Sequence, residues 1–78
     1  MTPEQEQVYF HWKRLGWCTL NRGALAVVVF QDRENEQAFS VWTQDRAGIL
    51  VEYFFGLDEV RQELKKIGVY EMYPDFAV

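Results

Sequence analysis

Hydrophobic residues gather in short blocks along the chain, and the most apolar block is Ala24–Phe30, with the sequence Ala-Leu-Ala-Val-Val-Val-Phe. It contains no charge, no glycine and no proline. Successive side chains of a strand point to opposite faces, so this run places apolar side chains on both faces. The pattern predicts a strand that is covered on both faces or lies centrally in a sheet.

Three further blocks are predicted to be strands. Trp17–Leu20 is a short one, and Gln37–Thr43 and Ile49–Phe55 show the alternation of apolar and polar positions that a sheet requires. The Asn-Arg-Gly sequence at 21–23 predicts a turn between the first strand and the central run, the alternative being one long strand broken by a bulge at Gly23. The other loops are about five residues long, too short for parallel crossovers, and indicate an antiparallel meander.

A helix is predicted at the N-terminus, over Pro3–Leu15. Thr2 can cap it, Pro3 suits the first helical position, and Gly16 supplies a stop. Three apolar residues fall on one face at i, i+4 and i+7, namely Val8, Trp12 and Leu15. Phe10 lies nearly opposite this stripe and is expected to be exposed unless another element covers it.

A second helix is predicted between Gly56 and Gly68. Its apolar stripe, at i, i+3, i+7 and i+10, consists of Leu57, Val60, Leu64 and Ile67. The segment Val69–Met72 is predicted to add a short edge strand before Pro74 ends pairing. The expected fold is therefore α+β: an N-terminal helix, a three- or four-stranded antiparallel β-meander, a second helix and a short C-terminal extension, forming a single domain over residues 1–78.

Aromatic residues make up 17% of the 78 residues, which is high for so short a chain. Large rings bury roughly 150–250 Å² each and can compensate for a small core. Six of them are expected to build that core: Trp12, Trp17, Phe39, Trp42, Tyr53 and Phe55. The remaining rings either form a binding face or a homodimer contact, or are hidden by a C-terminal tail that folds back over the sheet.

Charge and composition limit the cellular compartments and the classes of partner that we expect for this protein. The net charge is −4, which disfavours nucleic acid because it repels a polyanion. The N-terminus has no basic or apolar targeting segment, and no apolar run approaches the ~20 residues of a membrane span. Cys18 is the sole cysteine, so no internal disulfide forms. We expect a cytoplasmic protein without membrane association.

Chemistry-bearing residues are sparse. His11 is the only histidine, and no spacing links it to Cys18 as a nucleophile and base. Nothing in the sequence matches a phosphate-binding glycine loop or a metal-binding cluster, so we expect no catalytic residues, no cofactor and no metal. Asp32, Glu34 and Glu36 cluster in one hairpin loop, which favours a solvated loop tip or a negative surface for a basic partner.

These observations indicate a small non-enzymatic protein-binding module, such as an inhibitor, immunity or accessory protein of a mobile element. Its partner is expected to be another protein, with a basic one favoured by the acidic loop. The predicted partner-binding residues are Tyr9, Phe10, Asp32, Glu34, Glu36, Tyr70, Tyr73 and Phe76. The alternative is a nucleic-acid-binding domain that stacks bases on sheet aromatics.

Overall fold

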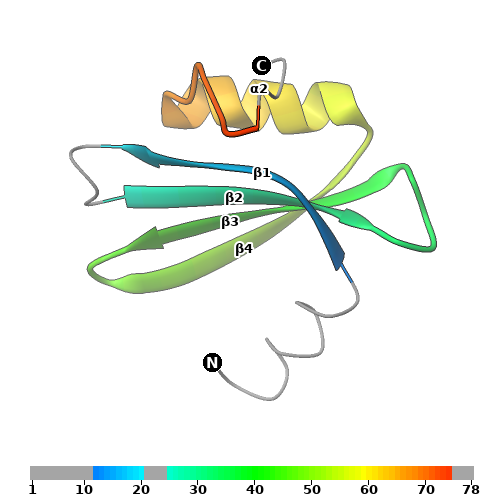
Figure 1. The fold of residues 1–78 in the computed structure, drawn as a ribbon, viewed down its shortest axis with the longest axis horizontal. Coiled ribbons are helices and arrows are strands. Elements are labelled where there is room, and N and C mark those ends of the chain that lie inside the picture. The colour runs from blue at the N-terminus through cyan, green and yellow to red at the C-terminus, as the bar shows by residue number, and fades with distance from the viewer. Residues whose placement is uncertain (1–11, 21–24, 75–78) are drawn as a thin grey trace.

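The computed structural model describes residues 12–20 and 25–74. This part of the chain contains one four-stranded sheet and one helix (Figure 1). The elements are β1 (Trp12–Leu20), β2 (Leu25–Asp32), β3 (Ala38–Asp45), β4 (Gly48–Phe55) and α2 (Leu57–Ile67). The strands lie in the order β1-β2-β3-β4 with antiparallel neighbours, so the predicted meander is confirmed with four strands.

The predicted N-terminal helix is wrong where the structure can be compared with it. Trp12–Leu15, assigned to that helix, belong to β1 and lie beside β2. The rest of the predicted helix lies outside the described residues. The expected α+β arrangement with two helices is therefore replaced, over the described residues, by a four-stranded sheet followed by a single helix.

A β-bulge explains the misleading pattern in β1. Arg14 is opposite Phe30 and Gly16 is opposite Val29, so Leu15 is an extra residue without a partner in β2. A bulge adds one residue to a strand, bends it and breaks the alternation of faces. The alternative of a single long strand broken at Gly23 is also wrong, because β1 and β2 lie side by side.

The central position of β2 confirms, for residues 25–30, the prediction that the apolar run forms a strand in the middle of the sheet. This strand lies between β1 and β3, and it has buried side chains on both faces. Val27 and Val29 face α2, whereas Phe30 is buried on the opposite face. The main core lies between the sheet and α2, and its fully or nearly buried members are Val27, Val29, Phe39, Val41, Val60, Leu64, Val69 and Met72.

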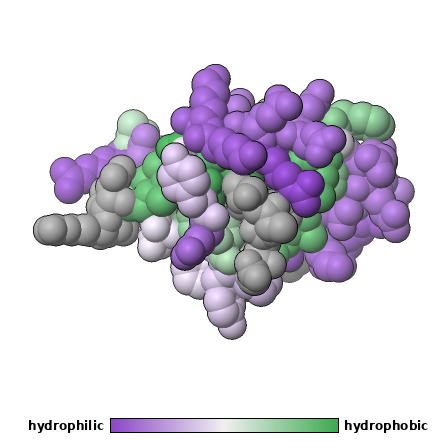
Figure 2. All heavy atoms as spheres, turned by 90° about the horizontal axis from the view of Figure 1, so that it is seen from above, coloured by the Kyte–Doolittle hydropathy of each residue, from purple (hydrophilic) through white to green (hydrophobic). Residues whose placement is uncertain are grey.

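Helix α2 begins and ends where the glycines predict. Gly68 has a left-handed conformation, which only glycine adopts without strain, and its N–H donates to the Lys65 carbonyl at 3.1 Å. The Val69 N–H donates to the Leu64 carbonyl at 2.8 Å, which completes a Schellman motif. On the α2 side of the molecule, the outer surface is mainly hydrophilic, with hydrophobic patches between the hydrophilic residues (Figure 2).

The C-terminal segment returns across the helix side of the molecule toward β1. Val69 and Met72 enter the core, while Tyr73 forms an isolated antiparallel bridge with Trp17. Two backbone hydrogen bonds of 2.8 Å, one in each direction, join Tyr73 and Trp17. The expected edge strand at 69–72 is therefore wrong: Val69 and Met72 are buried in the core, and the bridge to β1 forms at Tyr73.

Half of the aromatic core prediction is wrong. Phe39 and Trp42 are buried and Trp12 is half-buried, but Trp17, Tyr53 and Phe55 are exposed. The exposed residues lie on β1 and β4, the two edges of the sheet, where a ring has a neighbouring strand on one side only. Burial of these rings therefore depends on strand order, which the alternation of residues does not reveal.

Candidate functional site

The predicted partner-binding residues that the structure describes do not form one surface. Asp32, Glu34 and Glu36 lie at the β2–β3 loop, whereas Tyr70 and Tyr73 follow α2 and approach the β1 edge. Tyr9, Phe10 and Phe76 lie outside the described residues. The described members of the set are thus divided between two regions of the molecule.

The β2–β3 loop is an ordered acidic tip. The Asp32 carboxylate accepts the Glu34 N–H at 2.8 Å, and Asn35 Oδ1 accepts the Gln37 N–H at 3.1 Å. Such local bonds hold a tight turn. Glu34 and Glu36 are exposed, so their carboxylates face solvent at this end of the sheet while Asp32 supports the backbone.

The tyrosines at the other region are exposed although the segment that carries them is packed. Tyr70 and Tyr73 retain 77% and 70% of their surface, and the Tyr73 ring touches the Trp17 ring edge-on with centroids 5.9 Å apart. The bridge between the same two residues occupies the outer edge of β1 at Trp17. This part of the β1 edge is therefore closed to another strand.

The opposite edge of the sheet, β4, carries the most extensive apolar exposure. Ile49, Leu50, Tyr53 and Phe55 retain 43%, 58%, 63% and 66% of their surface. Among the described residues, no strand pairs with the outer side of β4. An edge strand of this kind is normally protected by charge, proline or a bulge, and Glu52 is the only charged residue in the strand.

The hydrogen bonds at the end of β4 show which backbone groups face outward. The Gly56 N–H donates to the Gln37 carbonyl at 2.7 Å, across the sheet, while the Phe55 N–H donates to the Glu59 carboxylate at 3.1 Å. Residues of an antiparallel strand alternate between the two directions. Ile49, Val51 and Tyr53 therefore turn their N–H and C=O groups away from β3, toward the open edge.

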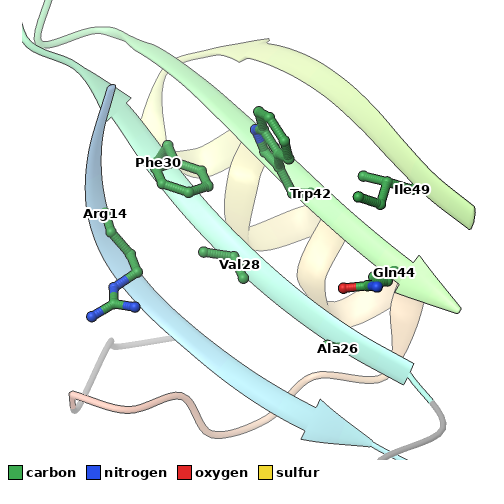
Figure 3. A pocket seen from close by; sticks show the side chains of 7 residues that line it. All are labelled: Arg14, Ala26, Val28, Phe30, Trp42, Gln44 and Ile49. Atoms are coloured by element: carbon green, nitrogen blue, oxygen red, sulfur yellow. The ribbon is translucent and has the colours of Figure 1, made fainter. Parts of the chain in front are cut away.

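A pocket lies on the sheet face opposite α2, close to this edge. Its volume is about 180 Å³, and its lining residues, from all four strands, are Arg14, Ala26, Val28, Phe30, Trp42, Gln44 and Ile49. Figure 3 shows these side chains on the near face of the sheet, with the helix behind. The Phe30 and Trp42 rings pack edge-on with their centroids 5.4 Å apart, so they form an apolar wall of the pocket.

Beyond the pocket, the bend of β1 draws the two edges of the sheet toward each other. The Trp12 ring, on β1, lies 5.9 Å from the Tyr53 ring, on β4. These two strands are separated by β2 and β3 in the sheet order. The sheet is therefore strongly curved, and its concave side carries the pocket.

Groups with chemical reactivity do not assemble in the described part of the chain. Burial raises the pKa of the Cys18 thiol, which lies beside the core on the helix side of the sheet and away from the pocket. No group of three potential metal ligands occurs within residues 12–20 and 25–74, and α2, with 11 residues, is too short to cross a membrane. His11 lies outside the described residues.

The β4 surface was missed at the sequence level although a signal exists. Ile49–Phe55 has apolar residues on both faces, as the central run does, and it is the last strand of a meander. The last strand of an open meander lies at an edge, so apolar residues on both its faces indicate a contact surface rather than core. No family model matches this sequence, and no curated protein or solved structure is significantly similar to it.

Proposed function

We propose that this chain is a small non-enzymatic protein-binding domain that binds an extended segment of its partner by strand addition to β4. The observation that carries the proposal is the open, apolar edge of β4. Strand addition derives affinity from main-chain hydrogen bonds and specificity from side chains on alternate positions. An inhibitor or accessory role in the cytoplasm is consistent with such a domain.

The geometry of β4 suits an added strand from Ile49 to Tyr53. The outward N–H and C=O groups of Ile49, Val51 and Tyr53 are aligned for a ladder, and the Glu59 carboxylate closes the ladder at Phe55. The same three side chains point to the concave face, where Ile49 also lines the pocket. An apolar side chain of the partner next to Ile49 would thus lie at the pocket wall.

Acidic residues at one end of this edge favour a basic flank in the partner. Glu59 lies at the Phe55 backbone, and the loop that carries Glu36 is joined to Gly56 through Gln37. An added antiparallel strand begins at the Phe55 end of β4, so basic residues before that strand would meet these carboxylates. Exposed charges of this kind mainly increase the association rate.

The test compares Val51→Pro with Val51→Ala. Both remove the valine side chain, but only proline removes the outward N–H, which β3 does not use. The tagged wild type is expected to capture a stoichiometric partner from extracts of its own host, Val51→Ala to retain it, and Val51→Pro to lose it. Circular dichroism checks that both variants fold. Equal capture by both folded variants would contradict strand addition.

A second comparison tests the side chains. Tyr53→Ala, on the open edge, should weaken capture, whereas Tyr70→Ala, which removes a ring that is also exposed but lies near the β1 edge, should not. A stronger effect at Tyr70 would move the binding surface to the C-terminal segment.

A further inference from the structure

We propose that the strand added to β4 is β4 of a second copy of this chain, with Val51 facing Val51 across a two-fold axis. This inference rests on the proposed function, since it names the occupant of the same edge, and that occupant takes the place of a partner with a basic flank. It predicts a continuous sheet of two meanders, with both α2 helices on one side. A two-fold axis perpendicular to the sheet relates antiparallel edge strands and keeps like faces together.

Symmetry makes the hydrogen-bonding groups of β4 self-complementary. The outward groups belong to alternate residues, Ile49, Val51 and Tyr53. A two-fold axis through Val51 pairs Val51 with itself and Ile49 with Tyr53 of the second copy. Every outward N–H and C=O group between Ile49 and Tyr53 then finds a partner.

Charge selects this register over its neighbour. Glu52 is the only charged residue of β4. An axis through Glu52 would place two carboxylates directly opposite each other, which destabilises a sheet. An axis through Val51 instead places Glu52 opposite Leu50, and it pairs the aromatic Tyr53 with the β-branched Ile49, a favourable cross-strand combination.

Registers farther along the strand leave apolar surface uncovered. An axis through Leu50 puts Tyr53 opposite the turn residue Ala47, and an axis through Tyr53 leaves Ile49 beyond the end of the partner strand. With the Glu52 register excluded by charge, the Val51 register is the one that places every residue from Ile49 to Tyr53 opposite a β4 residue of the second copy. These residues include three of the four exposed apolar side chains of β4.

The second copy also extends the pocket. Ile49 forms part of the pocket wall at the β4 side. In the Val51 register, Tyr53 of the second copy lies directly opposite Ile49 on the concave face. The two pockets of the dimer thus each gain a ring from the other copy, and the concave faces join.

The effect of salt on binding distinguishes a second copy of this chain from a basic partner. Each copy carries a net charge of −4, so two copies repel each other, and salt screens that repulsion with a Debye length of roughly 8 Å at physiological strength. We therefore expect the dimer dissociation constant to fall as the salt concentration rises from about 20 mM to about 300 mM, because screening becomes effective over this range. A complex with a basic protein would weaken over the same range.

Sedimentation equilibrium of the purified chain tests the pairing. The wild type and Val51→Ala should form dimers as concentration rises, and Val51→Pro should raise the dimer dissociation constant about tenfold or more, since each copy loses a ladder hydrogen bond. A wild type that stays monomeric up to millimolar concentration would overturn the second copy as occupant. If capture of another protein is still sensitive to Val51→Pro, the proposed function survives that result.

Cysteine trapping tests the register. In a Cys18→Ser background, Val51→Cys should form a disulfide-linked dimer on mild oxidation, because directly opposed hydrogen-bonded residues have Cα atoms about 5.5 Å apart. Tyr53→Cys is the matched control, since its two copies would be offset by about 13 Å along the strands and should not link. Equal or preferential linkage through Tyr53→Cys would overturn the Val51 register.

Discussion

At the scale of single residues, Ser40 and Trp42 form a buried polar pair on the concave side of the sheet. The Trp42 indole N–H donates to the Ser40 hydroxyl at 3.1 Å, and Ser40 has no exposed surface. Among the described residues, no buried side-chain nitrogen or oxygen lacks a hydrogen-bond partner. The pair lets β3 bury an indole on the face that α2 does not cover.

Ser40→Ala is expected to destabilise the fold by about 1–3 kcal/mol, because it leaves the Trp42 N–H buried without an acceptor. A double-mutant cycle with Trp42→Phe, measured by urea unfolding, isolates the hydrogen bond from the change in ring size. The double variant should lose less stability than the sum of the two single variants. Additive losses would show that this bond contributes nothing.

Cys18 couples stability to alkaline pH. Its pKa is raised by burial, so the folded state holds the thiol proton more tightly than the unfolded state does. The resulting stabilisation is fully present below the thiol pKa of the unfolded chain and is lost as pH rises through the raised pKa of the folded chain. Urea unfolding should thus show a steeper alkaline decline in the wild type than in Cys18→Ala. Parallel curves would contradict this linkage.

At the scale of elements, α2 stabilises the sheet through a narrow apolar stripe. Val60 and Leu64 are fully buried, and Leu57 and Ile67 pack at the border of the same cluster. The acidic residues Asp58 and Glu59 in the first turn and the basic pair at 65–66 in the last turn complement the helix dipole. The helix thus combines its own favourable ends with a close fit to the core.

Leu64→Ala should cost about 2–5 kcal/mol, since it opens a cavity at the centre of the core. That is a large share of the stability of a domain of this size. The melting temperature should fall by many degrees, while the exposed control Gln62→Ala should change it little. A stable Leu64→Ala variant would mean that the core collapses around the smaller side chain.

Prediction from the sequence succeeded for elements with one consistent period and failed where the period was broken. The helix between Gly56 and Gly68 has complete end signals, and the central run has no competing interpretation. In β1 the extra residue Leu15 interrupts alternation, so Trp12 and Leu15 acquire a helical spacing and Gly16 resembles a helix stop. Local sequence does not distinguish a bulged strand from a short amphipathic helix.

The exposed surface of β4 could not be predicted from the sequence, because it depends on contacts between segments that are far apart along the chain. The exposure of Tyr53 and Phe55 follows from the edge position of β4 and from the packing of α2 on the other side of the sheet. Conversely, Val69 and Met72 are buried because the chain turns back at Gly68. These outcomes are set by strand order and helix placement, and neither is encoded in the period of one segment.

At the scale of the whole molecule, the net charge of −4 opposes nucleic-acid binding. Phe30 and Trp42 are also buried, so these concave-face rings have little surface on which a base could stack. Fluorescence anisotropy with a labelled single-stranded oligonucleotide should show no sub-micromolar binding at physiological salt. Tight binding that persists with added salt would overturn the charge argument and favour the nucleic-acid alternative.

If chains pair through β4 as proposed, the Tyr73–Trp17 bridge limits how far the assembly can extend. With its β1 edge occupied at Trp17, the described sheet presents a single long open edge, and two such sheets that pair through β4 leave no further open edge at their centre. A chain cut before Tyr73 would present an edge at each side of the sheet, and head-to-tail addition then has no geometric end. In the proposed dimer, the Tyr73–Trp17 bridge would therefore favour a closed pair of chains over a fibre.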